Sequence, residues 1–354
     1  MTILDKIDIL GPQIGLSINN HQVYKSRIGG ILTILIAFIS VGVFFGFGAD
    51  LFSRINPSVM VNRLVNPDPS YTVSHLNFLF AIYDQASDKV FEEFDKKFYS
   101  YLDFYNWKGD GTRTIKRYFL ERCTDETIKK WDGYFKSPKS NYFCLPENTV
   151  LNITGIYNEG KYTSSRVQVD YCKNNTDPAV GPIKTDCYPR NFTEKNITGR
   201  IQMHYMLESN KIDNGNYTTP GSSVVIADTT NTNTNSWNRL KILFKNIEIK
   251  TDAGFFVNDW QTLILNSIEN IFPETVYTLG TNTIFSHILG NGKYKDVYTR
   301  SYIKVQNIFA LMGCFINAVM IIFRLIVKYF CYPKLIDIFN FIYKYKNIDE
   351  KKVK

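Results

Sequence analysis

The chain has 354 residues, with 41 Lys or Arg against 33 Asp or Glu, which gives a formal net charge of +8. From Arg324 to the C-terminus, eight basic and three acidic residues leave a net charge of +5, so most of the excess belongs to one short tail. A charge excess confined in this way is not the extended basic surface that binds nucleic acid, and no nucleic-acid partner is expected.

The N-terminal tail, residues 1–27, is the first segment with a recognisable pattern. In "LSINNHQVYK", apolar and polar residues alternate on either side of two asparagines. Alternation around a turn-forming pair predicts two short strands that pair with each other.

A long apolar helix is predicted over residues 28–49. This segment has 22 residues without a charge and is rich in Ile, Leu, Val and Phe, so as a helix it spans about 30 Å of hydrocarbon. A cleaved signal peptide is the main alternative, because Gly46 and Gly48 have the spacing of a cleavage site. Secretory apolar regions usually have about 7–15 residues close to the N-terminus, whereas 27 residues precede this one. The pattern therefore favours a permanent transmembrane helix over a signal peptide or a helix in a soluble core.

A large domain, residues 50–304, lies between this helix and a second apolar segment. Short runs of aromatic and β-branched residues alternate with turn signals, as in "TVLNITGIY" and "TSSRVQVDYC" on either side of "NEGK". Val167, Val169 and Tyr171 alternate with polar residues, as in a half-buried strand. We expect a β-rich α+β domain, a sandwich or open barrel built from antiparallel hairpins.

Two shorter segments of this domain differ from their surroundings. Residues 124–135, "TDETIKKWDGYF", start with a Thr N-cap and an acidic first turn and predict a helix. Residues 228–238, "DTTNTNTNSWN", offer almost no apolar side chain to bury and predict a mobile loop.

Four of the six cysteines belong to the same domain, namely Cys123, Cys144, Cys172 and Cys187. An even number of cysteines in one segment indicates disulfides and an oxidising compartment. Of the three possible pairings, Cys123–Cys144 with Cys172–Cys187 is favoured because it closes the shortest loops. None of the four has CxxC spacing or a histidine cluster beside it, so a zinc site is not expected.

Five Asn-x-Ser/Thr triplets also lie in the domain, beginning at Asn152, Asn174, Asn191, Asn196 and Asn216. Each is a candidate site for N-glycosylation. The region is so rich in Asn, Ser and Thr that several triplets would occur by chance, and the triplets are therefore compatible with glycosylation without establishing it.

A second transmembrane helix is predicted over residues 305–327. The 19 residues between Lys304 and Arg324 are uncharged, and the apolar run continues to Lys328 if the Arg324 side chain reaches the interface. Beyond it, the basic tail 328–354 has apolar residues at i, i+3, i+4 and i+7 from Leu335, which predicts an amphipathic helix on an anionic membrane surface. A solvated tail is the alternative.

Small and polar residues form one stripe on the second helix. By helical geometry Gln306, Gly313, Asn317 and Arg324 fall within about 40° of one another. An amide such as Asn317 is costly in hydrocarbon without a partner, so the stripe is expected to face protein or water. In the first helix, Gly42 and Gly46 form a GxxxG pair, which allows another helix to approach closely. The interpretations left open are packing of the two helices on each other, packing on a neighbouring copy, or a pore lined by the stripe.

The flanking charges indicate the orientation in the membrane. With a net charge of +5 after the second helix and +1 before the first, both tails are expected in the cytosol and residues 50–304 in the lumen or outside the cell. The plasma membrane or the endomembrane system is the expected location, and the mitochondrial inner membrane is the alternative.

Sequence patterns of catalysis are not found. The four histidines, His21, His75, His204 and His287, have no metal-ligand spacing, and the chain has no GxSxG, phosphate-binding loop or GxGxxG. Glu92 and Glu93 lie in a charged stretch typical of a solvated surface. We therefore expect no catalytic residue, cofactor or metal site, and no enzymatic activity.

Several blocks of the chain resemble a known class of proteins. "LSINNHQVYKSRIGGILTIL", "FLERCT", "YFCLP", "VDYCKNNT" and "RSYIKVQNIFALMGCFINAVMIIF" together resemble the large ciliate families of two-pass transmembrane proteins. The layout alone is similar to ATP-gated trimeric channels, to epithelial-sodium and acid-sensing channels, and to cargo receptors that cycle between ER and Golgi. Those receptors carry a K-T/S-x-x-G-G stretch, matched here by Lys25, Ser26, Gly29 and Gly30. The domain has fewer cysteines than any of these, so no ligand site is carried over.

Three functions fit these observations. The preferred hypothesis is a non-enzymatic structural or accessory subunit of an oligomeric membrane assembly, with the lipid bilayer and homo- or hetero-oligomeric membrane proteins as partners. The alternatives are an oligomeric ion channel and a cargo or adhesion receptor that binds other proteins.

Overall fold

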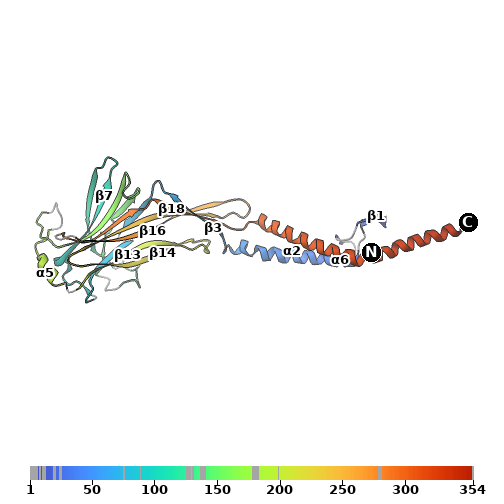
Figure 1. Cartoon of the computed structure of the whole chain (residues 1–354), viewed down its shortest axis with the longest axis horizontal. Coiled ribbons are helices and arrows are strands. Elements are labelled where there is room, and N and C mark those ends of the chain that lie inside the picture. Colours follow the sequence, from blue (N-terminus) through green and yellow to red (C-terminus); the bar gives the residue numbers. More distant parts are fainter. Residues whose placement is uncertain are drawn as a thin grey trace. The chain divides into compact units, whose positions relative to one another are not determined.

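Figure 1 shows a computed structural model of the chain, which describes residues 7, 9, 13–18, 21–23, 26–74, 76–87, 89–124, 129, 131–135, 141–177, 183–197, 199–277 and 281–352. The chain divides into two compact units. The first, here called the helical unit, comprises Met1–Ser58, Asp252–Asp259 and Ser301–Lys354. The second, here called the β unit, comprises Val59–Thr251 and Trp260–Arg300.

The helical unit is built on two long helices, α2 (Arg27–Ser53) and α6 (Val305–Lys352). The hydroxyl of Ser26 accepts a hydrogen bond from the Gly29 N–H at 3.0 Å and so caps the start of α2. The helix ends at Arg54, which adopts a left-handed conformation with φ 49°. The N-terminal tail forms the antiparallel strand pair β1 (Gln13–Ile18) and β2 (His21–Val23), as its alternating pattern predicted.

The two helices run antiparallel and pack on each other (Figure 1). Near one end Gly48 of α2 lies against Ile308 of α6, and near the other end Ile36 and Val327 are buried between the helices. Both helices are long and apolar enough to cross a membrane, and most of their surface is exposed in the structure. Because such a surface is stable in lipid and not in water, the chain is an integral membrane protein with two spans.

The α6 helix is longer than the predicted span. It continues without a break from the apolar segment through Pro333 to Lys352, so the tail helix is not a separate element. Pro333 lacks the N–H that would bond to the preceding turn, yet the helix passes through it.

The β unit contains two large sheets (Figure 1). The larger has eight strands, seven of which follow in the order β3 (Ser58–Val65), β18 (Tyr294–Ser301), β15 (Trp237–Asp252), β17 (Thr283–Asn291), β12 (Tyr162–Tyr171), β7 (Phe98–Trp107) and β8 (Arg113–Phe119). The eighth, β16 (Trp260–Val276), also pairs with β15. The pairing of β15 with β17 is parallel, while β17–β12, β12–β7 and β7–β8 are antiparallel.

The smaller sheet has six strands. Five follow in the order β14 (Gly221–Thr232), β13 (Ile201–Ile212), β5 (Phe78–Asp84), β10 (Phe143–Cys144) and β9 (Glu121–Arg122), and β6 (Lys89–Val90) pairs with β5. A separate pair is formed by β4 (Ser70–Ser74) and β11 (Val150–Thr154). Among the described residues, the β unit also has the short helices α3 (Phe94–Lys97) and α5 (Arg190–Lys195).

The main hydrophobic core lies between the two sheets, as in a sandwich. Phe80 and Tyr205 come from the smaller sheet, whereas Val167, Ile242 and Phe285 come from the larger. The alternation of Val167, Val169 and Tyr171 expected from the sequence places all three in this core. The prediction of two apolar helices flanking a large β-rich domain is therefore confirmed.

The other face of the smaller sheet is also covered. Leu79, Ala81 and Tyr83 alternate with the main-core residues of β5, and they pack with Trp131 and Tyr142 in a second cluster. Because both faces of β5 are covered, all seven of its residues are buried.

Two local predictions have different outcomes. The expected loop 228–238 is wrong over most of its length, because β14 continues to Thr232 and β15 starts at Trp237. The backbone of β13 pairs with residues 228–232 irrespective of their side chains, and Thr230 and Thr232 are buried. Of the predicted helix 124–135, residues 125–128 and 130 lie outside the described residues, and residues 131–133 form a turn and not a helix.

Candidate functional site

The polar stripe of α6 does not face α2. Gly313, Asn317 and Arg324 are exposed, whereas the α6 residues that pack on the α2 side include Ile316, Val319, Met320 and Phe323. At 100° per residue, the centre of the stripe lies roughly a quarter of a turn from the centre of the α2 contact. The structure therefore does not support the interpretation that the stripe packs the two helices of one chain together.

The GxxxG pair of α2 is open in the same way. A Cβ atom added to Gly42, Gly46 or Gly313 would meet no atom within 4 Å, apart from the backbone of the glycine's own helix turn. A Cβ atom added to Gly48, by contrast, would lie 3.4 Å from the Phe52 side chain and 3.7 Å from the Ile308 side chain. The glycines singled out by the sequence thus leave a smooth helix surface that no part of the described chain covers.

Gln306 belongs to the stripe by sequence but has a different surrounding. Its side-chain amide donates a hydrogen bond to the backbone carbonyl of Phe256, in the turn between β15 and β16. It therefore fixes the start of α6, and the uncovered part of the stripe consists of Gly313, Asn317 and Arg324.

A second uncovered surface lies on the larger sheet and was missed by the sequence interpretation. The end strand β3 exposes Met60, Val61, Leu64 and Val65, and neighbours in sequence point to opposite faces of a strand. Both faces of this edge are therefore apolar and bare. The signal was present in the sequence, because "SVMVNRLV" is a dense apolar run, but such a run is equally typical of a buried strand.

The start of β16 has the same character. Its first five residues are all exposed, and they include Trp260, Leu263 and Ile264. Exposed apolar side chains on both faces of two strands are more than a monomeric soluble domain ordinarily shows. We refer to these residues of β3 and β16 as the bare strands.

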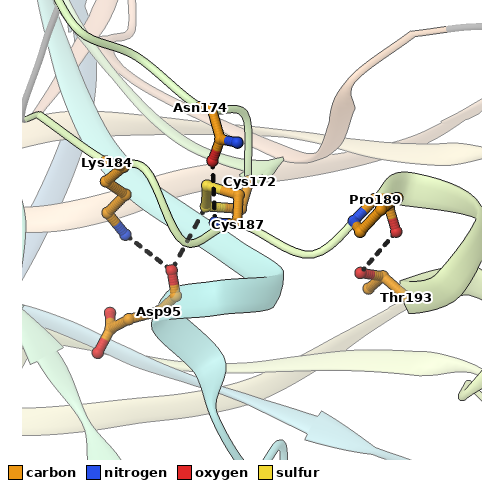
Figure 2. The surroundings of a disulfide bond; sticks show 7 residues. All are labelled: Asp95, Cys172, Asn174, Lys184, Cys187, Pro189 and Thr193. Atoms are coloured by element: carbon orange, nitrogen blue, oxygen red, sulfur yellow. Dashed lines mark hydrogen bonds between the residues drawn. A yellow bond between two sulfur atoms is a disulfide. The ribbon is translucent and has the colours of Figure 1, made fainter.

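The cysteines pair as the sequence favoured. Cys123 is joined to Cys144, which links β9 and β10 at a Cα–Cα distance of 5.1 Å. Cys172 is joined to Cys187 at 5.4 Å, and the loop that this bond closes is held to α3 (Figure 2). There the Lys184 ammonium donates to the carbonyl of Asp95 at 2.9 Å, and the Asn174 side chain accepts the Cys187 N–H at 2.9 Å.

The asparagines of the five triplets lie on the surface of the β unit. Asn152, Asn174, Asn191 and Asn196 are exposed, and Asn216 is half-buried. The Asn216 side chain accepts hydrogen bonds from the backbone of Thr218 and Thr219. Four of the five positions thus leave room for a glycan.

A cluster of side chains that could hold a metal ion is not found in the described part of the chain. No cluster of three or more His, Cys, Asp or Glu side chains occurs there. A pocket of the β unit brings together Arg239, Lys241 and Glu274, but Arg239 and Glu274 form an ion pair across it. His204 and His287 are buried. The Nδ1 atom of His204 shares a hydrogen bond with the Tyr142 hydroxyl, and the Nε2 atom of His287 shares one with the Thr230 hydroxyl.

Comparison with known proteins identifies a family and several distantly similar solved structures. Residues 79–290, more than half of the chain, match the model of the family described as "Uncharacterised 80 kDa protein N-terminal domain". No curated protein matches the chain.

Among solved structures, the chain is similar to a proton-activated chloride channel, with 10% identity over 85% of this chain and 95% of that one, at a TM-score of 0.27. It is also similar to Erv41p, with 12% identity over 69% of this chain and 99% of that one, at a TM-score of 0.22. Scores this low carry no functional argument.

Proposed function

The chain belongs to this 80 kDa protein family, and we propose that it is a structural or accessory subunit of an oligomeric membrane assembly, without enzymatic activity. The observation that carries the proposal is the exposed Asn317 on an apolar, membrane-spanning helix. An amide in hydrocarbon costs free energy unless a partner satisfies it, and α2 packs on a different side of α6.

A neighbouring copy would provide the missing cover. Gly313 lies one helical turn from Asn317 and has no neighbour that a second helix would have to displace. Small residues allow two helices to approach until side-chain amides can bond across them. The bare strands support the same proposal, because their apolar side chains would be covered by contacts between β units.

Cysteine cross-linking in native membranes tests the proposal. In a background in which Cys314 and Cys331 are replaced by Ser, Gly313→Cys is expected to form a disulfide-linked dimer on mild oxidation. Leu311→Cys is the matched control, because Leu311 lies at nearly the same depth but about 160° round the helix. Equal cross-linking at both positions, or none at either together with a lone monomer in mild detergent, would reject the proposal.

The second candidate is an oligomeric channel, in which Asn317 from each copy would line a hydrated constriction. The exposure of both Asn317 and Arg324 along one line of α6 supports this reading. If this second candidate is correct, purified protein in planar bilayers will conduct ions. Asn317→Leu will then lower the conductance severalfold, while Leu311→Ala will leave it unchanged. If bilayers that contain cross-linkable oligomers show no ion conductance, the channel is excluded and the structural role is retained.

The proposal includes a location in the plasma membrane or the endomembrane system, with the β unit in the lumen or outside the cell. The two disulfides of the β unit support it, because disulfides persist in oxidising compartments. It also agrees with the resemblance to ciliate two-pass proteins. A mass shift of the native protein on treatment with a glycosidase is the expected result, and protection of the β unit within sealed mitochondria would contradict it.

A further inference from the structure

The turn between β15 and β16 belongs to the helical unit, unlike the strands that it connects. Residues 252–259 contact the end of α2 and the start of α6. The backbone N–H of Val305 donates to the carbonyl of Phe255 at 3.1 Å, and Gln306 donates to the carbonyl of Phe256. This turn is therefore fixed at the same end of the helix pair as Arg54 and Lys304.

The carboxylate of Asp252 in this turn is buried, whereas Asn258 and Asp259 are exposed. Asp252 forms an ion pair with Lys304 at 2.9 Å, and its side chain is only 2% exposed. The same carboxylate accepts the N–H groups of Asp259 at 2.9 Å and Gly254 at 3.1 Å. Burial opposes ionisation, but these hydrogen bonds outweigh it and hold the pKa of Asp252 below its usual value.

Two features hold the turn in this form. Gly254 is required, because a Cβ atom there would overlap the carbonyl oxygen of Val257. The guanidinium of Arg54, buried at the end of α2, lies 4.1 Å from the centre of the Phe255 ring. A cation over an aromatic face is attracted to the ring, so Arg54 fixes Phe255 at the end of α2.

The apolar side chains of the turn point outward. Phe255, Phe256 and Val257 are 47%, 65% and 76% exposed. Phe52 and Ile55, at the end of α2, are also exposed. One largely buried ion pair, Asp252 with Lys304, beside three consecutive exposed apolar side chains is unusual for a turn in water. Exposed apolar groups of this kind are typical of a segment that lies in a membrane interface.

We propose that Phe255, Phe256 and Val257, together with Phe52 and Ile55, insert into the interfacial region of the bilayer on the side of the β unit. The occupant of this surface is lipid and not a second copy of the chain, because the turn continues the exposed apolar surface of α2 beyond its last residue, Ser53. Phe side chains are typical of the apolar face of a segment that lies in the membrane interface. The turn is thus a third membrane attachment, besides the two spans.

Fluorescence quenching by brominated lipids tests the proposal. The probe is Val257→Trp in the full chain, in nanodiscs made with phosphatidylcholine that carries bromine near the headgroup or deep in the acyl chain. A Trp260→Phe background removes the one native tryptophan next to the turn, and the other three, Trp107, Trp131 and Trp237, belong to the β unit. The difference spectrum between variant and background reports on residue 257.

The expected result is a blue-shifted emission that shallow bromines quench at least twofold, and more strongly than deep ones. The matched control is Ile183→Trp, at a similarly exposed apolar residue of the β unit, which is expected to stay unquenched. Emission typical of water without quenching would overturn the proposal, and so would a blue-shifted emission without quenching, since that indicates cover by protein. If Val257→Trp fails to fold, Phe256→Trp provides the same measurement with a more conservative change.

Discussion

Asp103 and Arg117 are joined across strands β7 and β8 by two hydrogen bonds, from Nε to Oδ1 at 2.7 Å and from Nη2 to Oδ2 at 2.8 Å. The Asp103 side chain is 4% exposed, and the guanidinium lies 3.9 Å from the centre of the Tyr101 ring. Because β8 is the last strand of its sheet and pairs only with β7 among the described strands, this pair contributes to fixing it.

Arg117→Met is expected to destabilise the β unit by about 2–3 kcal/mol, because it leaves the Asp103 carboxylate buried without its cation. The double variant Asp103→Asn/Arg117→Met removes the unpaired charge and is expected to recover part of that loss. Chemical denaturation of the full chain in nanodiscs, followed by tryptophan fluorescence, gives both values. Equal stability of the single and double variants would show that the charge of Asp103 is not the cause.

The disulfide between Cys123 and Cys144 is expected to stabilise the β unit by about 3 kcal/mol, since it closes a loop of 21 residues in the unfolded chain. Cys123→Ala/Cys144→Ala should lower the midpoint of denaturation accordingly. The loss is expected to exceed that of Cys172→Ala/Cys187→Ala, because the first bond is packed against Trp131 and Tyr142 in a buried cluster. The reverse order would contradict this reasoning.

The folded chain is expected to lose stability in acid because of the buried His287 side chain. It is fully buried, and burial lowers its pKa to about 3 in the folded chain from about 6.5 in the unfolded chain. As the pH falls below about 6.5 the unfolded chain binds a proton that the folded chain does not, so stability decreases from there towards pH 3. His287→Gln is expected to flatten this part of the pH dependence, and an unchanged slope in the unfolding temperature between pH 6.5 and 4 would count against it.

The glycines of α2 are expected to differ in effect. A Cβ atom added at Gly46 meets no neighbouring side chain within 4 Å, so Gly46→Leu should leave the helix pair intact and shift the oligomer to monomers in mild detergent. Gly48→Leu would press on Phe52 and Ile308, and overpacking of this kind costs about 1–3 kcal/mol. Light scattering and thermal unfolding separate the two effects. If the oligomeric state of the Gly46→Leu variant is unchanged, the GxxxG pair is not part of the contact between copies.

The bare strands provide a further test of assembly. Ile264→Asp alters a side chain that is 65% exposed, so the fold should be stable to within about 0.5 kcal/mol. The association constant between copies is expected to fall at least tenfold, because a carboxylate would be carried into an apolar contact. Ile242→Asp, at a fully buried position of β15, is the control and is expected to prevent folding.

The sequence predicted those features that depend on length, periodicity and spacing along the chain. Both spans, the alternating strand 162–171 and the N-terminal strand pair belong to this group. The loop predicted at 228–238 became strand because β13 provides a partner, and pairing between distant segments leaves no local pattern. The parallel pairing of β15 with β17 could not be predicted for the same reason.

The candidate site was predicted in part. A helical wheel identifies Gly313 and Asn317 as neighbours, but it cannot tell which side of the helix its partner occupies. The bare strands and the turn at residues 252–259 depend on what remains uncovered after folding, which composition does not reveal. An apolar run such as "SVMVNRLV" predicts a strand, but it does not indicate whether that strand is buried or exposed.

The pairing of β3 with β18 constrains how the chain is made. Only four residues separate the strand β3 from the first span, yet its partner β18 begins 229 residues after β3 ends, at Tyr294. At synthesis rates of about 5–20 residues per second, roughly 10–50 s pass between the synthesis of β3 and that of its partner strand β18. During that interval the apolar edge of β3 is unpaired, so a chaperone that binds extended chains is expected to hold it until β18 has been made.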